Sequence, residues 1–177
     1  MRRIIYLLSL AVSCFLGGCG YHLTGEAQTP SLLAGKTIAI PMWSSKSYRP
    51  NLEAILTGCL VDEFALRSGG MVAAEDAAEL LLTGTIVTYV TTPVSYTAAD
   101  QVREYRATMT VDATLAEKRS QKVLWKGILS ASQDYQAIND PTLQNRIALQ
   151  QNSEDAALRE ISRKIAQQLF QKMSENF

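Results

Sequence analysis

The stretch Glu104-Tyr105-Arg106-Ala107-Thr108-Met109-Thr110-Val111-Asp112-Ala113-Thr114-Leu115 alternates between apolar or aromatic and polar side chains from Tyr105 onwards. Because successive residues of a β-strand point to opposite faces of its sheet, this period of two predicts an apolar face and a threonine-rich face. An antiparallel sheet with two such unlike faces is typically covered on one side only. The stretch therefore predicts a strand in a half-covered sheet.

Two more strands flank this one along the chain, one from Leu80 and one at about residues 122–132. No helical crossover separates the three strands, so antiparallel pairing is the simplest topology. Shorter strands are expected at 36–41, ended by Pro41, and at 71–74, with a polar loop at 44–49 between them. In the strand from Leu80, the apolar face is expected to hold Leu80, Leu82, Ile86 and Val90. The opposite face is expected to hold Thr83, Thr85, Val87, Tyr89 and Thr91.

Two amphipathic helices are predicted before and after these strands. The first follows Pro50 and ends at Gly69-Gly70, since glycine is common just past helix ends. The second starts either at Asp140-Pro141 or at Ser153, which leaves residues 142–152 undecided. Apolar residues recur at three- and four-residue steps in both segments. The stripes are Leu52, Ile55, Leu56, Cys59, Leu60 and Phe64 in the first, and Leu158, Ile161, Ile165, Leu169 and Met173 in the second.

Together these elements predict an α+β fold: a two-layer sandwich in which two helices pack on one face of a mixed, mostly antiparallel sheet. The helical stripes match the apolar face of the sheet without surplus apolar positions. The whole of residues 37–177 is therefore expected to form a single domain.

The first residues predict an exported lipoprotein. Met1-Arg2-Arg3 is positively charged, and the apolar run that follows ends at Leu16, too short to span a bilayer. Leu16-Gly17-Gly18-Cys19 resembles the lipobox of bacterial lipoproteins. We therefore expect a signal peptide at 1–18, a covalent lipid on Cys19 as membrane anchor, and a tether at 19–36. By the sorting rule for enteric lipoproteins, Gly20 in place of Asp after the cysteine implies passage to the outer membrane. We expect the anchored domain to lie on its periplasmic side.

Charge and cysteine content narrow the function further. Lys plus Arg and Asp plus Glu number 17 each, whereas a nucleic-acid-binding surface requires a basic excess. Cys14 lies in the predicted signal peptide and Cys19 is assigned to the lipid, so Cys59 has no partner for an internal disulfide. Its apolar neighbours predict a buried thiol that acts as a small hydrophobic side chain.

The sequence contains no recognisable catalytic or metal-binding motif. His-Glu-x-x-His, Cys-x-x-Cys and Gly-x-Ser-x-Gly are all missing, and the only histidine, His22, falls in the predicted tether. We therefore expect a non-catalytic protein without a cofactor apart from the lipid on Cys19.

A charged cluster at 117–122, the tip cluster, joins the second and third long strands. It is interpreted either as a solvated hairpin tip or as a patch that contacts phosphates or an acidic partner. Arg103 and Arg106 would extend this patch only if the loop 96–102 folds beside it. The candidate binding residues are Lys118, Arg119, Lys122, Arg103 and Arg106.

Cys19-Gly20-Tyr21-His22-Leu23-Thr24-Gly25 and the strand from Glu104 to Thr114 together resemble LptE, the lipopolysaccharide-assembly lipoprotein family. Thr24 departs from the family, which often has arginine there. The resemblance covers nearly the whole mature chain in the order and spacing of its elements. It implies a non-catalytic protein that sits in the LptD-type outer-membrane β-barrel, supports its assembly and binds lipopolysaccharide. The matched motifs assign no contact residue for lipopolysaccharide, so the five cations above are candidates by local charge alone.

Two other functions remain open at this stage. A stand-alone periplasmic lipid-binding lipoprotein would need an enclosed apolar cavity between sheet and helices. A lipoprotein that activates another envelope machine would be separated from the LptE-type function by the partner it captures.

Overall fold

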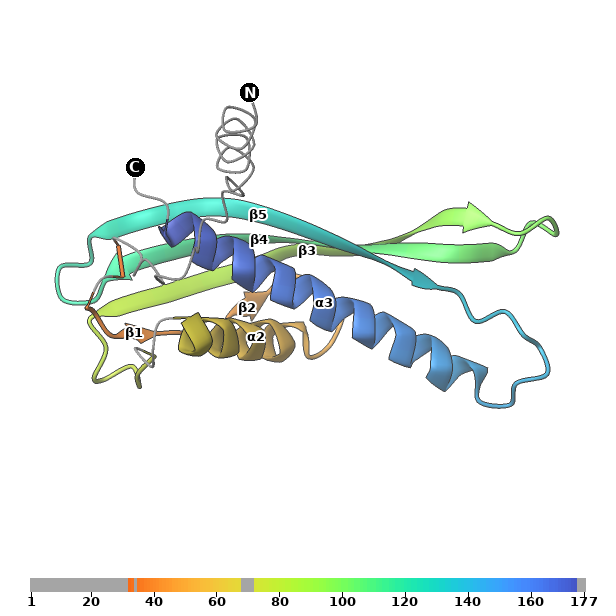
Figure 1. Cartoon of the computed structure of the whole chain (residues 1–177), viewed down its shortest axis with the longest axis horizontal. Coiled ribbons are helices and arrows are strands. Elements are labelled where there is room, and N and C mark those ends of the chain that lie inside the picture. The colour runs from red at the N-terminus through yellow and green to blue at the C-terminus, as the bar shows by residue number, and fades with distance from the viewer. Residues whose placement is uncertain (1–31, 34, 68–71, 175–177) are drawn as a thin grey trace, which may run out of the picture.

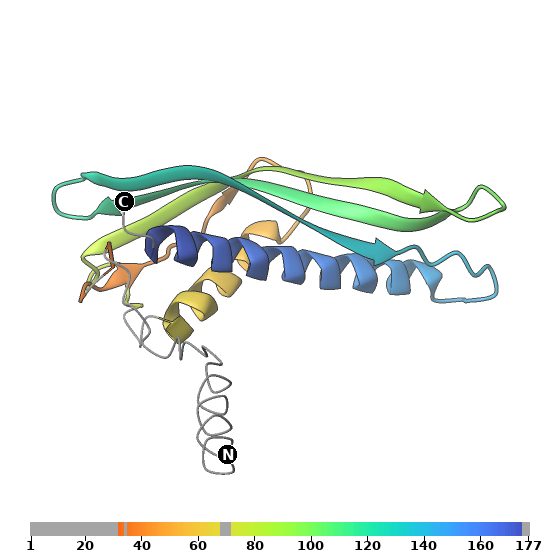
Figure 2. The same cartoon turned by 45° about the horizontal axis from the view of Figure 1, so that its top comes forward.

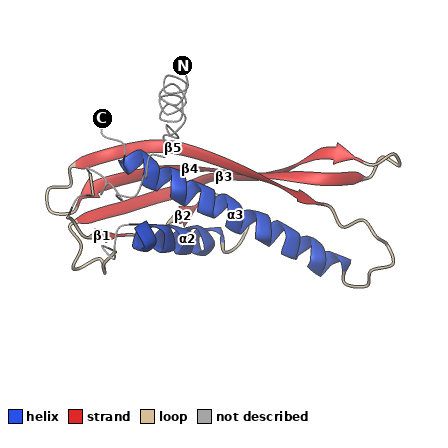
Figure 3. Cartoon of the chain, viewed as in Figure 1, coloured by secondary structure: helices blue, strands red, loops and turns tan. Residues whose placement is uncertain are grey.

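A computed structural model describes residues 32–33, 35–67 and 72–174 of the chain. The predicted signal peptide, Cys19 and residues 20–31 of the tether lie outside the described residues. Two helices pack on one face of a five-stranded sheet, which confirms the predicted α+β sandwich (Figures 1 and 3). The elements are β1 (Ile38–Ala39), β2 (Ser44–Ser45), α2 (Leu52–Arg67), β3 (Leu80–Tyr96), β4 (Val102–Glu117), β5 (Val123–Gln136) and α3 (Arg146–Ser174).

Three long antiparallel strands form most of the sheet. β3 pairs with β4 and β4 pairs with β5, both antiparallel, and Val111 of β4 lies opposite Leu129 of β5. β1 and β2 each pair parallel with the first half of β3. The predicted mixed, mostly antiparallel sheet is therefore confirmed.

The short strand β2 was not predicted, because its polar residues were interpreted as loop. Ser44 lies opposite Thr85, and the two hydroxyl oxygens are 2.8 Å apart. Hydrogen bonds to a neighbouring strand, rather than apolar alternation, hold this segment in place. The strand expected at 71–74 is reduced, among the described residues, to a single parallel bridge between Val72 and Ile38.

A β-bulge interrupts the pairing of β3 with β4. Ile86 lies opposite Val111, but the next pair joins Thr88 to Thr110, which leaves Val87 as an extra residue. A bulge of this kind shifts the strand by one position, so side chains beyond it change face. The predicted alternation of β3 is therefore correct up to Ile86 and wrong beyond it.

The side chains beyond the bulge show the exchange. Tyr89 was expected on the face opposite Leu80, but it lies on the helix side, where its hydroxyl donates to Glu154 at 3.2 Å. Val90 was expected in the core and is 51% exposed. Thr91 lies opposite the buried Ala107 and so shares the face of Tyr89.

The core lies between the sheet and the two helices. Phe64 of α2 and Phe170 of α3 meet edge to face, with ring centroids 5.3 Å apart, and so join the two helices. Each large apolar side chain removed from water contributes about 1.5–3 kcal/mol, so this layer dominates the stability of the domain. The predicted α3 stripe is fully buried, whereas in α2 only Leu52, Leu56, Leu60 and Phe64 are, Ile55 and Cys59 being half-buried.

The helix α3 begins at Arg146, which settles the residues that the sequence left undecided. Asp140 opens the preceding turn by accepting a hydrogen bond from the backbone N–H of Thr142 at 2.9 Å. The first turn of α3 is exposed, with Ile147 at 73%. Figures 1 and 2 show α3 leaving the sheet toward this N-terminal end.

Trp43 packs directly on the backbone of β3. Its indole is buried, and its backbone N–H donates to the hydroxyl of Thr57 in α2 at 3.1 Å. A Cβ atom on Gly84 would lie 2.5–2.6 Å from three atoms of the Trp43 ring. Gly84 is therefore required for the close approach of this indole to the sheet.

We expect Gly84→Ala to lower the free energy of unfolding by about 2 kcal/mol, because the added methyl group overlaps the Trp43 ring. Gly58→Ala is the matched control: Gly58 is an exposed residue of α2 with no atom within 4 Å of the added Cβ. It should raise the free energy of unfolding by about 0.5–1 kcal/mol through helix propensity. Urea denaturation followed by circular dichroism measures both, and equal effects would contradict the assigned contact.

Candidate functional site

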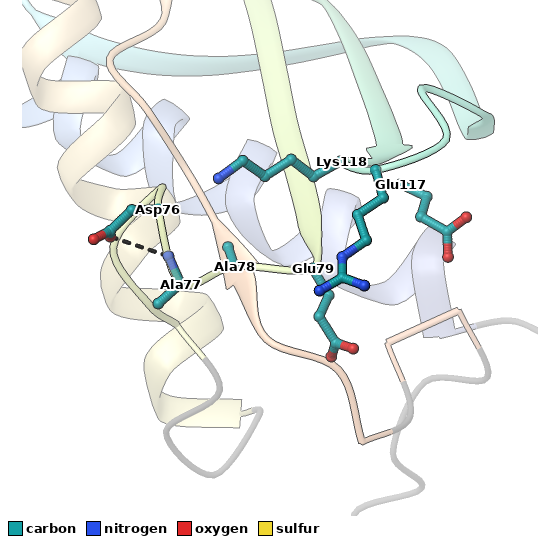
Figure 4. A pocket seen from close by; sticks show the side chains of 7 residues that line it. Asp76, Ala77, Ala78, Glu79, Glu117 and Lys118 are labelled. Atoms are coloured by element: carbon teal, nitrogen blue, oxygen red, sulfur yellow. Dashed lines mark hydrogen bonds between the residues drawn. The ribbon is translucent and has the colours of Figure 1, made fainter.

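The tip cluster forms one wall of a pocket of about 630 Å³ at the end of the sheet (Figure 4). The opposite wall is the turn that precedes β3. Residues lining the pocket are Asp76, Ala77, Ala78, Glu79, Glu117, Lys118 and Arg119.

Lys118 has a structural role in this pocket. Its Nζ atom donates to the backbone carbonyl of Glu75, and its backbone N–H donates to the carbonyl of Glu79 at 2.8 Å. Figure 4 shows its side chain reaching toward the 75–77 turn, while the carboxylate of Glu117 points the other way. Lys118 thus fastens the β4–β5 turn to the segment before β3 and is not a free binding group.

Glu117 is the other anchored charge of the tip cluster. A hydrogen bond from the Ser120 hydroxyl, at 2.6 Å, and the nearby Lys36 ammonium lower the pKa of the Glu117 carboxyl. Lys36 and Glu117 form an exposed ion pair with an N–O distance of 3.5 Å. Arg119 and Lys122 remain as exposed cations of the tip cluster. Only Arg119 of these two lines the pocket, together with the carboxylates of Asp76, Glu79 and Glu117, so the charge of the pocket is mixed rather than basic.

The structure does not bring Arg103 and Arg106 to the tip cluster. They lie near the start of β4, whereas Lys118 follows its end. At about 3.3 Å per residue, Arg106 and Lys118 are separated by roughly 40 Å along the strand. The condition for extending the patch, that the loop 96–102 folds beside the tip cluster, is therefore not met. Contact of the five cations with lipopolysaccharide stays a prediction.

Hydroxyl side chains cover the face of the sheet that points away from the helices, here called the open face. Two ion pairs lie on it, Arg106 with Asp134 at 2.6 Å and Lys126 with Asp112 at 3.8 Å. Glu104, on the same face, accepts a hydrogen bond from the Ser95 hydroxyl at 2.8 Å. Ile128 stands among them with 72% of its surface exposed. The hydroxyl residues are Thr83, Thr85, Thr88, Thr92, Thr108, Thr110, Thr114, Ser130 and Ser132.

A second pocket of about 420 Å³, the distal pocket, lies on the helix side at the far end of the sheet. It is bounded by the start of β4, the end of β5, the segment after β5 and the first turns of α3. The rings of Tyr105 and Tyr135 stack in its wall, with centroids 5.6 Å apart and planes at 27°. The other lining residues are Ala137, Ile138, Asn139, Arg146, Ile147, Gln150, Gln151 and Glu154.

Sequence reasoning missed the distal pocket. Tyr105 was assigned to the apolar face of its strand, but its partner Tyr135 lay beyond the predicted end of the third strand at about 132. The register that places the two rings opposite each other follows from the pairing of β4 with β5. A longer third strand in antiparallel register would have been the signal for this pair.

A group of charges that we call the Arg49 cluster fixes α3 beside the distal pocket. The guanidinium of Arg49 donates to Glu154 at 2.6 Å and to Asp155 at 2.7 Å. It also lies 5.8 Å from the ring centroid of Tyr89, as in a cation–π contact. Burial and the Glu154 carboxylate raise the pKa of Tyr89, so its hydroxyl stays protonated and donates to Glu154.

Cys59 is half-buried on α2, whereas a buried thiol was predicted. Burial, followed by the negative charge of Asp62, raises the pKa of its thiol. A raised pKa keeps the thiol protonated at neutral pH and lowers its reactivity.

Two further observations concern the chemistry open to the domain. Within residues 32–33, 35–67 and 72–174, no helix is both long and apolar enough to cross a bilayer. In the same ranges, three or more His, Cys, Asp or Glu side chains do not gather in a geometry that would hold a metal ion.

Comparison with known proteins identifies a family. The family model LptE, described as lipopolysaccharide-assembly, matches residues 35–173. No curated protein sequence matches the chain.

Solved structures share the fold at low sequence identity. Rare lipoprotein B from Shewanella oneidensis is 18% identical, with a TM-score of 0.51 over 77% of this chain and 93% of that chain. A lipoprotein B from Nitrosomonas europaea is 14% identical, with a TM-score of 0.53 over 88% of this chain and 90% of that chain. These likenesses show the fold alone.

We expect Arg49→Ala to lower the free energy of unfolding by about 2 kcal/mol, because it leaves the partly buried Glu154 carboxylate without its cation. Arg106→Ala is the matched control, since Arg106 also donates two hydrogen bonds to carboxylate oxygens but does so in solvent. Arg106→Ala should lower the free energy of unfolding much less, because exposed ion pairs contribute little to stability. Urea denaturation compares the two, and equal losses would contradict the role given to the Arg49 cluster.

Proposed function

The chain belongs to the LptE lipopolysaccharide-assembly family, a family of non-catalytic envelope lipoproteins, and on that premise we propose its function. It is an outer-membrane lipoprotein that docks inside an LptD-type β-barrel, assists the assembly of that barrel and binds lipopolysaccharide during transport to the cell surface. The observation that carries the docking proposal is the chemistry of the open face.

The open face suits the interior of a barrel. The lumen of an outer-membrane barrel is polar, whereas its outer surface is apolar. Threonine and serine hydroxyls exchange hydrogen bonds with such a wall, and the paired charges of Arg106 with Asp134 leave little net charge to desolvate. A sheet face of this kind is buried against a polar wall at a lower cost than one with unpaired charges.

The length of the sheet also supports docking within a barrel. The 17 residues of β3 correspond to about 55 Å at 3.3 Å per residue. The apolar band of an outer-membrane barrel is about 25 Å tall. A domain of this length extends through a lumen and presents one end of the sheet on each side of the membrane.

A lipid on Cys19 is part of the proposal. Several acyl chains would hold the domain at the membrane surface, where the barrel assembles. Tethering raises the effective concentration of the domain near its partner without any added contact.

The interior weighs against a stand-alone lipid carrier. The side chains between sheet and helices, such as Leu56, Met109 and Ile165, are fully buried against one another. An acyl chain placed between these layers would have to displace side chains that are already packed.

We expect the mature protein to co-purify with a large β-barrel protein from detergent-solubilised outer membranes. Ser130→Arg combined with Ser132→Arg should lower the recovered barrel at least tenfold, because two unpaired cations on the open face would be desolvated on docking. Gln167→Arg combined with Gln168→Arg adds the same charge to the exposed side of α3 and should leave recovery unchanged.

Quantitative mass spectrometry of the captured material measures this difference. Isolation of the unaltered protein as a free monomer in mild detergent would contradict docking. Equal losses from both double variants would contradict the assignment to the open face.

The tip cluster requires a separate test, because Arg119 and Lys122 are its exposed cations. If they contact the phosphates of lipopolysaccharide, Arg119→Glu with Lys122→Glu should weaken binding by about tenfold, with an unchanged circular dichroism spectrum. The control reverses two exposed cations of α3, Arg159→Glu with Lys172→Glu. If the tip variant binds lipopolysaccharide as well as the unaltered protein does, Arg119 and Lys122 are part of a solvated hairpin tip and not of a binding site.

A further inference from the structure

We propose that the distal pocket binds a sugar ring that carries an acidic substituent. The inference rests on the proposed function, which supplies lipopolysaccharide as the source of such rings. It assigns recognition of the saccharide to residues at the opposite end of the sheet from the tip cluster (Figure 1).

The tyrosine pair provides the surface for the ring. Tyr105 and Tyr135 are both half-buried, and both line the pocket. One face of a pyranose ring carries C–H groups, which are apolar and slightly positive, and the π-face of an aromatic ring is slightly negative. Two rings that hold each other in place present such a surface with little loss of side-chain freedom.

Two polar groups beside the tyrosines are held in fixed positions. The Oε1 atom of Gln150 accepts a hydrogen bond from the backbone N–H of Ile138 at 2.8 Å, which leaves its amide hydrogens for a ligand. The Oε1 atom of Glu154 accepts hydrogen bonds from the Arg49 guanidinium and the Tyr89 hydroxyl. In the part of the chain that the structure describes, its Oε2 atom has no such partner and can accept a sugar hydroxyl.

Arg146 is the residue that we expect to bind the acidic substituent of the sugar. Its guanidinium has no ion pair or side-chain hydrogen bond among the described residues, and its side chain is exposed at the pocket. Glu154 is already neutralised by Arg49, so Arg146 is the uncompensated charge of the lining. A phosphate or carboxylate on the sugar would accept its paired N–H groups.

The size and lining of the pocket favour a sugar ring over an acyl chain. Its volume of about 420 Å³ lies within the range of ~300–1,000 Å³ usual for small-molecule sites. Only Ala137, Ile138 and Ile147 contribute aliphatic side chains, and the rest of the lining is aromatic, amide or charged. A single substituted sugar ring satisfies this combination, whereas an acyl chain would leave the polar groups unpaired.

Calorimetric titration of the mature protein in detergent tests the proposal with two probes. One is phosphorylated core oligosaccharide free of lipid, and the other is lipid A, whose headgroup is a phosphorylated disaccharide. If the core oligosaccharide binds, the recognised sugar belongs to the core of lipopolysaccharide. If only lipid A binds, the recognised sugar belongs to the headgroup of lipid A. Tyr135→Ala should lower the affinity for the probe that binds by about tenfold. Arg146→Ala should lower it by about fivefold.

The controls separate recognition from folding. Tyr135→Phe keeps the ring and should retain binding, and Tyr48→Ala removes a fully exposed tyrosine elsewhere and should change nothing. Failure of both probes to bind, or binding unchanged in Tyr135→Ala and Arg146→Ala, would overturn the proposal. Co-purification of the barrel with Tyr135→Ala is measured in parallel. Lost probe binding with normal barrel recovery concerns the pocket alone, whereas a barrel that is not recovered even with the unaltered protein contradicts docking.

Discussion

One-sided burial of β4 is the constraint on which the structure depends. Every second side chain from Ala107 to Leu115 is fully buried under the helices, while the residues between them face away. This strand lies between β3 and β5, so its register sets the faces of both neighbours. A slip of one residue would expose the apolar set and bury the threonines, and such a slip is strongly disfavoured.

The bulge at Val87 links this register to the distal pocket. Without the extra residue, Tyr89 would point to the open face and could not reach α3. With it, Tyr89 and Arg49 both contact Glu154, and so the helix is held where it diverges from the sheet. A local irregularity in one strand thus positions a carboxylate that belongs to the other layer.

The sequence predicted what depends on local periodicity and failed where distant residues decide. The stripe of α3, the alternation of β4 and the half-covered sheet follow from spacing alone. The bulge depends on how β3 pairs with β4, and β2 is held by Thr85, far along the chain. The charged candidates do not form one patch, because Arg106 lies near the start of β4 and Lys118 just after its end. A local charge count does not detect this separation.

The proposed function needs one surface for a partner and another for a ligand, and the sheet provides these two surfaces on its two sides. The open face and the distal pocket lie on opposite sides of the same sheet. If a barrel wall covers the threonines, as proposed, Tyr105 and Tyr135 face away from that wall. Because the two surfaces lie on opposite faces of the same strands, a ligand in the pocket and a partner on the open face need not compete. A domain with a sheet covered on both sides would have lost one of these surfaces, which gives a functional reason for the half-covered architecture.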